Sequence, residues 1–262
     1  MEAFVFNTVP TIVSGSGSSL QLSQQCELLG VSCPLLVTDP GLMAIGLVQP
    51  VIQGLEAGGM RPVLFDQVRE EPPEAVVRAA EERAGSASVD GVIAVGGGSS
   101  MDVAKVVAVV LGGDQSLAEL YGVDQVRGSR VPMILVPTTA GTGSEVTPVA
   151  VITTGETTKA GVSSPVLLPD VAVLDADLTL GLPPAITAMT GVDAMVHAIE
   201  AYTSVHKKNP VSDNLAKSAL TLLSANIRTA VREGGNRDAR ANMLLGATLA
   251  GQAFANAPVA AV

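Results

Sequence analysis

The stretch Asp90-Gly-Val-Ile-Ala-Val-Gly-Gly-Gly-Ser-Ser-Met-Asp-Val-Ala-Lys105 decides the fold class of this chain. Its apolar first half predicts a buried strand, its three glycines predict a tight turn, and the residues after the glycines predict a helix. Such a helix start offers unpaired N–H donors and a partial positive charge, which suit a phosphate or a pyrophosphate. Ser99 and Ser100 could cap the helix and also reach a phosphate oxygen. The run matches neither G-x-G-x-x-G nor the Walker pattern, so an ordinary glycine-rich turn stays the alternative.

Strand patterns and helix patterns alternate on both sides of this stretch. Short apolar runs predict the strands, and the connections between them and the helices are short. This alternation is typical of a mostly parallel sheet covered by helices. The expected strands are Cys33–Val37, Arg61–Phe65, Gly91–Val95, Met133–Val136 and Val171–Leu174, and a hairpin is expected from Val149–Thr154 and Thr157–Ser163.

The pattern changes to helices alone in the last third of the chain. The expected helices are Pro184–Ser204, Pro210–Glu233 and Asp238–Ala255. We therefore predict an α/β domain over residues 1–178 and an all-helical domain over residues 179–262.

Asp193 and His197 lie four residues apart in the first of these helices, and therefore on one helix face. A carboxylate and an imidazole at this spacing can bind one metal ion. The alternative is a pair that only forms a hydrogen bond. The packing of this helix is expected to come from its larger apolar residues, which are Ile186, Met189, Val192, Val196 and Ile199.

A polar loop, Pro137-Thr-Thr-Ala-Gly-Thr-Gly-Ser-Glu145, follows the strand Met133–Val136. Ligands of open parallel sheets bind beyond the carboxyl ends of the strands, so the threonine hydroxyls and glycine N–H groups of this loop are candidate ligand-binding groups. The same composition also fits an ordinary surface loop.

Three single residues have two interpretations each. Asp39 follows the strand Cys33–Val37 and could hydrogen-bond a ribose diol, although Asp-Pro-Gly is also a common turn. Lys159 in the hairpin could bind a ligand or be solvated. His206 is expected to be an exposed residue after a helix rather than a ligand.

The composition excludes several classes of function. The net charge is −10 and no basic cluster occurs, which argues against nucleic acid or an anionic membrane surface as a partner. The longest apolar runs are too short or too interrupted to span a bilayer. With two isolated cysteines and no signal-peptide pattern at the N-terminus, we expect no disulfide and a location in the reducing cytoplasm.

Three segments together resemble signatures of the iron-containing (group III) alcohol dehydrogenases, in that family's order and spacing: Gly96–Lys105, Pro137–Glu145 and Gly191–Glu200. The resemblance covers essentially the whole chain. It implies a dehydroquinate synthase-like architecture, in which a dinucleotide-binding sheet domain precedes an all-helical domain. It also implies an NAD-dependent and metal-dependent dehydrogenase that acts on a primary or secondary alcohol, or on the aldehyde or ketone in reverse.

The resemblance assigns roles to individual residues. Asp39 would hold the adenine ribose and disfavour a 2′-phosphate, which implies NAD rather than NADP. Glu71-Pro72 departs from the family, which often has Asn before this proline near the adenine. The remaining cofactor-binding residues would be Gly96, Gly97, Gly98, Ser99 and Ser100 around the pyrophosphate, and Thr138, Thr139, Thr142, Lys159, Leu178 and Leu182 along the nucleotide.

Asp193 and His197 would be the first two of four metal ligands. Iron(II) is the metal that the resemblance implies, and zinc or another divalent ion also suits such ligands. In the family two further histidines follow, the first of them just after a run like Ala250–Asn256. We therefore expect the helical domain to be incomplete in this chain, which ends at Val262.

In an enzyme of this family the metal acts as a Lewis acid on the alcohol oxygen, and hydride passes from carbon to the nicotinamide. A polyol dehydrogenase or a maleylacetate reductase of the same superfamily is an alternative. Another is a nucleotide-binding fragment without catalysis, because two protein ligands rarely hold a catalytic metal. The resemblance implies small-molecule alcohols or aldehydes as substrates, and a homodimer or larger homo-oligomer as the assembly.

Overall fold

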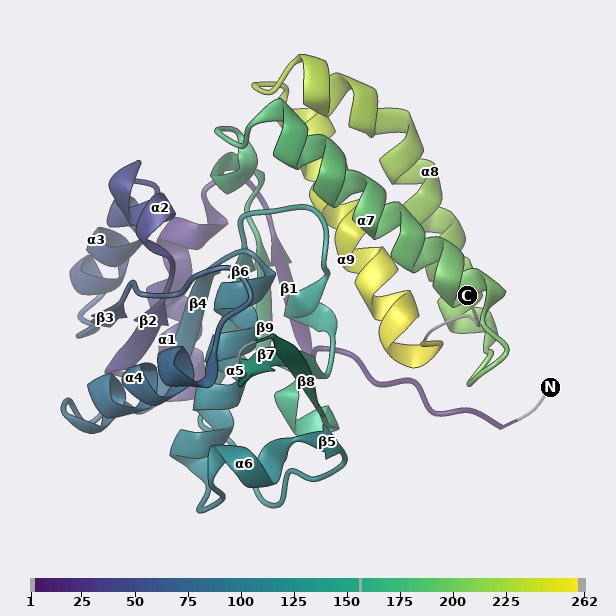
Figure 1. Ribbon diagram of the computed structural model, residues 1–262. Coiled ribbons are helices and arrows are strands. Elements are labelled where there is room, and N and C mark those ends of the chain that lie inside the picture. Colours follow the sequence, from purple (N-terminus) through teal and green to yellow (C-terminus); the bar gives the residue numbers. More distant parts are fainter. Residues whose placement is uncertain (1–2, 156, 259–262) are drawn as a thin grey trace. The chain divides into compact units, whose positions relative to one another are not determined.

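The computed structural model describes residues 3–155 and 157–258 (Figure 1). It divides into two compact units, each with its own core. The sheet unit consists of Val9–Pro137 and Pro148–Val173, and the helical unit consists of the described parts of residues 1–8, 138–147 and 174–262. The polar loop at 138–147 therefore belongs to the helical unit. The division into domains at residues 178/179 stays a prediction.

A six-stranded sheet in the order β1-β9-β6-β4-β2-β3 forms the frame of the described sheet unit. The neighbours from β9 to β3 pair in parallel, which confirms the mostly parallel sheet that the sequence predicts. The strands are β1 (Thr11–Ser14), β2 (Pro34–Val37), β3 (Val63–Phe65), β4 (Gly91–Gly96), β6 (Met133–Pro137) and β9 (Val171–Leu174).

The strand order changes direction between β2 and β4. After β2 the chain adds β3 on one side, and β4 then pairs with β2 on the other side, with Val37 opposite Ala94. In an open parallel sheet such a reversal is the place where ligands bind, outside the carboxyl ends of the two strands. The residues after Val37 and after Gly96 are therefore the ones to examine for a ligand site.

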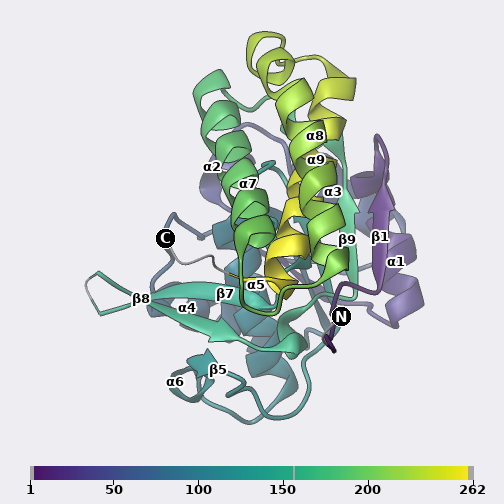
Figure 2. The same cartoon turned by 90° about the vertical axis from the view of Figure 1, so that its right-hand side faces the viewer.

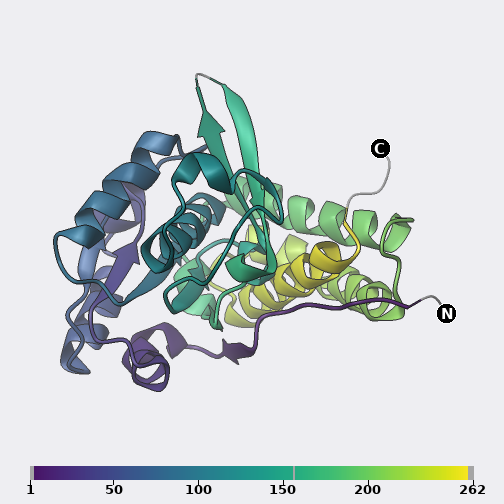
Figure 3. The same cartoon turned by 90° about the horizontal axis from the view of Figure 1, so that it is seen from below.

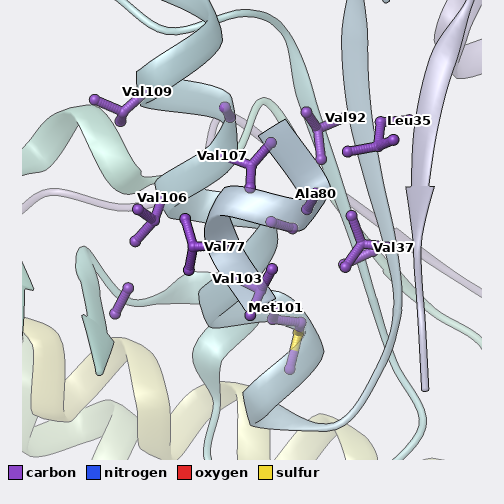
Figure 4. Close-up of a cluster of buried hydrophobic side chains, with 14 of the residues drawn as sticks. Leu35, Val37, Val77, Ala80, Val92, Met101, Val103, Val106, Val107 and Val109 are labelled. Carbon is purple, nitrogen blue, oxygen red and sulfur yellow. The ribbon is translucent and has the colours of Figure 1, made fainter. Parts of the chain in front are cut away.

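Helices connect the strands, and α5 is the most deeply buried of them. Its apolar side chains from Met101 to Val109 contribute to the core of the unit, together with residues of β2, β4 and α4. Figure 4 shows valines of α5 beside Leu35, Val37 and Val92 of the sheet and beside Val77 and Ala80 of α4. The helical segments are η1 (Ser18–Gln21), α1 (Leu22–Leu29), α2 (Pro40–Ala44), α3 (Gln49–Ala57), α4 (Glu74–Gly85), α5 (Gly98–Gly112), α6 (Leu117–Leu120) and η3 (Pro165–Leu167).

A small second sheet, β5-β8-β7, belongs to the same unit. Its strands are β5 (Gly122–Val123), β7 (Val149–Thr154) and β8 (Thr158–Ser163). β7 and β8 pair antiparallel from Val149 opposite Ser163 to Thr154 opposite Thr158, as the predicted hairpin requires. Figure 3 shows the two strands side by side in green.

The helical unit contains α7 (Pro184–Thr203), α8 (Pro210–Arg232) and α9 (Arg237–Asn256), preceded by η2 (Ser144–Val146) and η4 (Ala176–Thr179). The three long helices run side by side and each contacts the other two (Figure 2). Their bounds agree with the predicted helices to within one residue at every end. Alanines dominate the buried residues of this core.

The predicted packing face of α7 is wrong. Met189, Val192, Val196 and Ile199 are 45–60% exposed. The buried face consists of small residues instead, namely Thr187, Gly191, Ala194, Ala198 and Ala201. A methyl group on Gly191 would lie 2.7 Å from the Met243 side chain, so only small residues allow α7 this close to its neighbours.

Candidate functional site

Asp39 and the glycine turn lie at the carboxyl ends of neighbouring strands, where the strand order reverses. β2 ends at Val37, two residues before Asp39, and Gly97 directly follows β4. The parallel pairing of β2 with β4 brings these two predicted positions to one edge of the sheet.

The glycine turn exposes the start of a long helix. Gly97 is the N-cap of the 15-residue α5, with φ −77° and ψ −172°, and it has no side chain to cover the first N–H groups. A Cβ on Gly96 would lie 2.6 Å from the Ser100 side chain, so the tight turn requires glycine there. Gly97, Gly98 and Ser99 are half-buried, whereas Ser100 is buried beneath the turn. The accessible backbone donors of this helix start can therefore receive an anionic group.

Asp39 caps a helix that sequence reasoning missed. One carboxylate oxygen accepts a hydrogen bond from the backbone N–H of Leu42 at 3.0 Å, and Pro40 occupies the first turn of α2. The expected turn is therefore a helix start. A carboxylate has two oxygens with several acceptor positions, so this cap is compatible with a hydrogen bond to a ligand.

Thr38 is a residue of this edge that sequence reasoning did not single out. Its side chain has no exposed area, and its Oγ1 has no hydrogen-bond partner among the described residues. No motif marks this position in the sequence, because a threonine at a strand end is common.

Lys159 lies on β8 and forms an ion pair with Glu71, with 2.7 Å between Nζ and Oε1. Both side chains are more than half exposed, at 56% and 65%. Exposed pairs of this kind contribute little to stability, so the lysine remains available to a ligand. Glu71 is the position at which the chain departs from the family pattern.

The threonines of the polar loop differ in exposure. Thr138 is buried, Thr139 is half-buried and Thr142 is exposed. The Oγ1 of Thr142 accepts a hydrogen bond from the backbone N–H of Ser144 at 3.3 Å. These hydroxyl groups lie in the helical unit.

The glycines of the loop allow close packing against α7 and α9. A Cβ on Gly141 would lie 2.8 Å from Thr190 Cβ in α7. Gly143 has φ +61°, and a Cβ there would lie 2.7 Å from the backbone Cα of Gly251 in α9. The structure therefore shows why glycine is needed at these two positions, and the prediction that the N–H groups of the loop bind a ligand stays a prediction.

Glu145 anchors the same loop from within the helical core. It is 2% exposed, and its Oε1 accepts a hydrogen bond from the fully buried Thr248 Oγ1 at 2.8 Å. The two residues are 103 positions apart, so no local pattern could pair them. The loop therefore has a fixed place on α9.

Leu178 and Leu182 lie near the start of the helical unit. Leu178 is 8% exposed within η4. The backbone oxygen of Leu182 accepts a hydrogen bond from Arg240, which is 2% exposed and also donates to Thr187 Oγ1 and to the backbone oxygen of Gly234. Burial lowers the pKa of this guanidinium from its ordinary value. Arg240 fixes the segment that carries Leu182, and sequence reasoning did not identify it.

Asp193 and His197 share one face of α7, as their spacing predicts. His197 Nε2 lies 3.8 Å from Asp193 Oδ1, and the two side chains are 22% and 48% exposed. His197 Nδ1 is buried and has no hydrogen-bond partner among the described residues. The Phe254 ring of α9 packs against the imidazole at a centroid distance of 5.0 Å.

The ligand atoms of Asp193 and His197 are of the types that bind a divalent metal, but they are fewer than a complete site requires. The imidazole Nε2 of His197 and the partly exposed carboxylate of Asp193 are suitable ligands for iron(II) or zinc. Among the described residues no group of three or more His, Cys, Asp or Glu side chains could hold a metal ion. Asp193 and His197 therefore supply part of a coordination shell. His206 is exposed, as expected.

No helix in the described part of the chain combines the length and the apolar character that crossing a membrane requires.

Comparison with known proteins gives consistent matches along the chain. The family model described as iron-containing alcohol dehydrogenase matches residues 10–176, and the one described as Fe-containing alcohol dehydrogenase family, C-terminal, matches residues 187–262. A long-chain-alcohol dehydrogenase 1 of Geobacillus thermodenitrificans is 44% identical over 95% of this chain and 63% of its own length. A sulfoacetaldehyde reductase of Bilophila wadsworthia is 39% identical over 97% of this chain and 66% of its own length.

Solved structures agree with these matches. A 1,3-propanediol oxidoreductase superposes with a TM-score of 0.95 at 36% identity, over 98% of this chain and 68% of that protein. A sulfoacetaldehyde reductase from Bifidobacterium kashiwanohense in complex with NAD+ superposes with a TM-score of 0.93 at 32% identity, over 99% of this chain and 69% of that protein. The chain thus spans about two thirds of the length of these relatives.

Proposed function

The chain belongs to the iron-containing alcohol dehydrogenase family, and on this basis we propose that it provides the NAD-binding site and part of the metal site of a dehydrogenase. The reaction is the transfer of a hydride between a primary or secondary alcohol and NAD. The names of its relatives include long-chain alcohol, sulfoacetaldehyde and 1,3-propanediol enzymes, so the substrate class is an alcohol or the matching carbonyl compound.

The glycine turn at the strand-order reversal is the observation that carries the proposal. The N–H groups at the start of α5 would bind the pyrophosphate, because a helix N-terminus offers free donors and a partial positive charge. Asp39, on the neighbouring strand end, would accept hydrogen bonds from the adenine ribose. A carboxylate repels a 2′-phosphate, so NAD would bind more tightly than NADP.

We assign the other cofactor contacts to single residues. Lys159 would approach the nucleotide, and further contacts would come from Thr138, Thr139, Thr142, Leu178 and Leu182. These assignments rest on residue type and on the resemblance of the motifs.

Asp193 and His197 would bind iron(II), or zinc or another divalent ion. The separation of 3.8 Å between His197 Nε2 and Asp193 Oδ1 supports this assignment, because an imidazole and a carboxylate so close together on one helix face can bind the same ion. A divalent ion there supplies Lewis-acid polarisation of a substrate oxygen. The chain's own residues hold the donors in place: the α7 backbone sets their spacing, and the Phe254 ring limits the rotation of the imidazole.

Ligand titrations test the proposal. We expect NAD+ to bind with a stoichiometry of one per chain by isothermal titration calorimetry, and NADP+ to bind more weakly. The Asp39→Ala variant should reduce this difference by weakening NAD+ binding and relieving the repulsion of NADP+. If neither dinucleotide binds, the nucleotide assignment is wrong.

Metal binding is tested separately. We expect this 262-residue chain to hold iron(II) or zinc weakly, because two protein ligands are fewer than the three or more of catalytic sites. Stoichiometric metal after dialysis, together with alcohol oxidation by a chain of verified mass, would contradict this expectation. Loss of the residual metal in His197→Ala, measured by elemental analysis, would support the ligand assignment.

The assembly and the location of the protein complete the proposal. We expect a homodimer or a larger homo-oligomer, which light scattering measures directly. Cys26 and Cys33 are both free, which is consistent with a reducing cytoplasm.

A further inference from the structure

Two charged residues of α5, Asp102 and Lys105, follow the glycine turn without forming part of it. Lys105 has no exposed area, and its side chain is the largest of those that are fully buried among the described residues. An ammonium group in such a place is unfavourable unless it is hydrogen-bonded.

Both residues bind the backbone of β7. Lys105 Nζ donates to the backbone oxygen of Val149 at 2.8 Å, and the backbone N–H of Val151 donates to Asp102 Oδ2 at 3.0 Å. Val149 and Val151 are alternate residues of one strand, so these backbone groups point to the same side of it. The ammonium donor of Lys105 thus meets a backbone acceptor of β7, and the carboxylate acceptor of Asp102 meets a backbone donor of the same strand.

β7 is one of the two outer strands of the sheet β5-β8-β7, and at one end of its outer edge the Thr153 N–H donates to the backbone oxygen of Pro72. An outer strand has a row of N–H and C=O groups that no neighbouring strand pairs. Asp102 and Lys105 supply partners for this row, so α5 takes the place of a further strand along this part of the edge.

The far end of α5 is held by a separate backbone hydrogen bond, in which the Val131 N–H donates to the Ala108 oxygen at 3.0 Å. The core-facing residues closer to the start of α5 are mainly valines and alanines, which hold the helix by buried area (Figure 4). Apolar contacts of similar shape allow a helix to rotate or slide a little at small cost, because they are not directional. The two hydrogen bonds to β7 restrict both movements.

We propose that Asp102 and Lys105 are positioning residues that fix the start of α5 for the pyrophosphate of the nucleotide. This rests on the proposed function, because it takes the N–H groups after Gly97 as the pyrophosphate donors. Asp102 is about one helical turn from those donors. A rotation of α5 that breaks its bond to Val151 would turn the donors away from the phosphate oxygens.

The test compares two ligands on matched variants of the full chain. ADP contains the pyrophosphate and adenosine lacks it, so the ratio of their affinities isolates the contribution of the α5 start. Asp102→Leu removes the acceptor, whereas Asp102→Asn keeps an oxygen that can accept from Val151. Lys105→Met keeps most of the apolar stem and removes the ammonium. Arg78→Met is the control, because it breaks an exposed ion pair with Glu74 on α4.

We expect ADP to bind about 10–100-fold more weakly to Asp102→Leu and Lys105→Met, which is the range for losing good hydrogen bonds to a charged group. Adenosine should bind within about twofold of the unmodified chain in all variants, because no pyrophosphate donor serves it. Asp102→Asn and the control should retain ADP binding. Calorimetric titration measures each affinity.

Three results would overturn the proposal. ADP affinity could be unchanged in Asp102→Leu, adenosine affinity could fall as much as ADP affinity, or Asp102→Asn could lose as much as Asp102→Leu. If Lys105→Met does not fold, the comparison of Asp102→Leu with Asp102→Asn tests the proposal. Hydrogen exchange at the Val151 amide should then be fast in Asp102→Leu and slow in Asp102→Asn. Failure of the unmodified chain to bind ADP would refute the proposed function instead.

Discussion

Replacing Thr248 with valine tests whether the polar loop is anchored by its buried carboxylate. Thr248 has no exposed area, and its hydroxyl oxygen lies 2.8 Å from Glu145 Oε1 and 3.0 Å from the backbone oxygen of Leu244. The single hydroxyl hydrogen favours the carboxylate, because hydrogen bonds to a charged acceptor are the stronger ones. Valine has the same shape and the same branching, so the substitution removes the hydrogen bond and leaves no cavity.

The expected loss follows from the charge and burial of the pair. Removing a buried hydrogen bond to a charged group costs about 1.5–3 kcal/mol. For a chain of this size that corresponds to a decrease in Tm of about 3–12 °C. Urea unfolding followed by circular dichroism measures the free energy, and a thermal scan gives the Tm.

Thr221→Val is the matched control. Thr221 is exposed on α8, and its hydroxyl donates to the backbone oxygen of Lys217 at 2.9 Å, four residues earlier. Thr248 makes the same kind of contact with Leu244, so the difference between the two variants isolates the bond to Glu145. The control should change the free energy of unfolding by less than about 0.5 kcal/mol.

A double-mutant cycle with Glu145→Gln then measures the coupling between Glu145 and Thr248 directly. Contacting residues show interaction energies of about 0.5–3 kcal/mol, whereas independent sites add. The reasoning would be refuted if Thr248→Val and Thr221→Val were equally stable, or if the double variant lost the sum of the two single losses.

Three further predictions follow from the same structure. Gly143→Ala should lower the free energy of unfolding in urea by more than about 3 kcal/mol, because a Cβ would lie 2.7 Å from an α9 backbone carbon. Gly155→Ala is the control: Gly155 has a similar φ of +62° but open space around it, so this substitution should cost only about 1–2 kcal/mol. Burial raises the pKa of Asp90, but hydrogen bonds from Ser32 and Cys33 outweigh burial, so the pKa lies below its ordinary value of 3.8. The carboxylate therefore stabilises the fold at pH values above 3.8, and this stabilisation is lost as the pH falls further. Asp90→Asn should flatten the acid side of the curve of stability against pH. Burial, and then the nearby acidic residues, raise the pKa of Cys26 from 9.0 to about 12. Its thiol should therefore not react with a disulfide reagent at pH 8 in the folded chain. The free energy of unfolding should fall as the pH rises above 9.0, because the thiol of the unfolded chain then ionises first.

Local patterns in the sequence predicted most of the elements. The strands β2, β3, β4, β6 and β9, the hairpin and the three long helices occur within a few residues of their predicted bounds. These signals are local, because strand and helix periods and the proline and glycine positions extend over only a few residues. The missed elements α2, α6 and β5 are short, and Asp-Pro-Gly at the start of α2 resembles a simple turn.

The candidate site was predictable only in part. The glycine turn, Asp39 and the pair Asp193–His197 are visible as residue types at short spacings. Thr38 and Arg240 were not identified, because a strand-end threonine and an arginine early in a helix are ordinary in sequence. Only burial makes them unusual, and burial depends on neighbours that are remote in the chain.

The sequence by itself determined that a strand, a glycine turn and a helix follow one another, and that Asp193 and His197 share a helix face. Tertiary structure alone decided which face of α7 is buried, that the polar loop is anchored on α9, and that the charged residues of α5 bind β7. The reason is that such contacts join residues tens to a hundred positions apart, as Lys105 with Val149 and Glu145 with Thr248 do. Small residues make close approach possible, but their weak hydrophobicity gives no signal of which helix will approach.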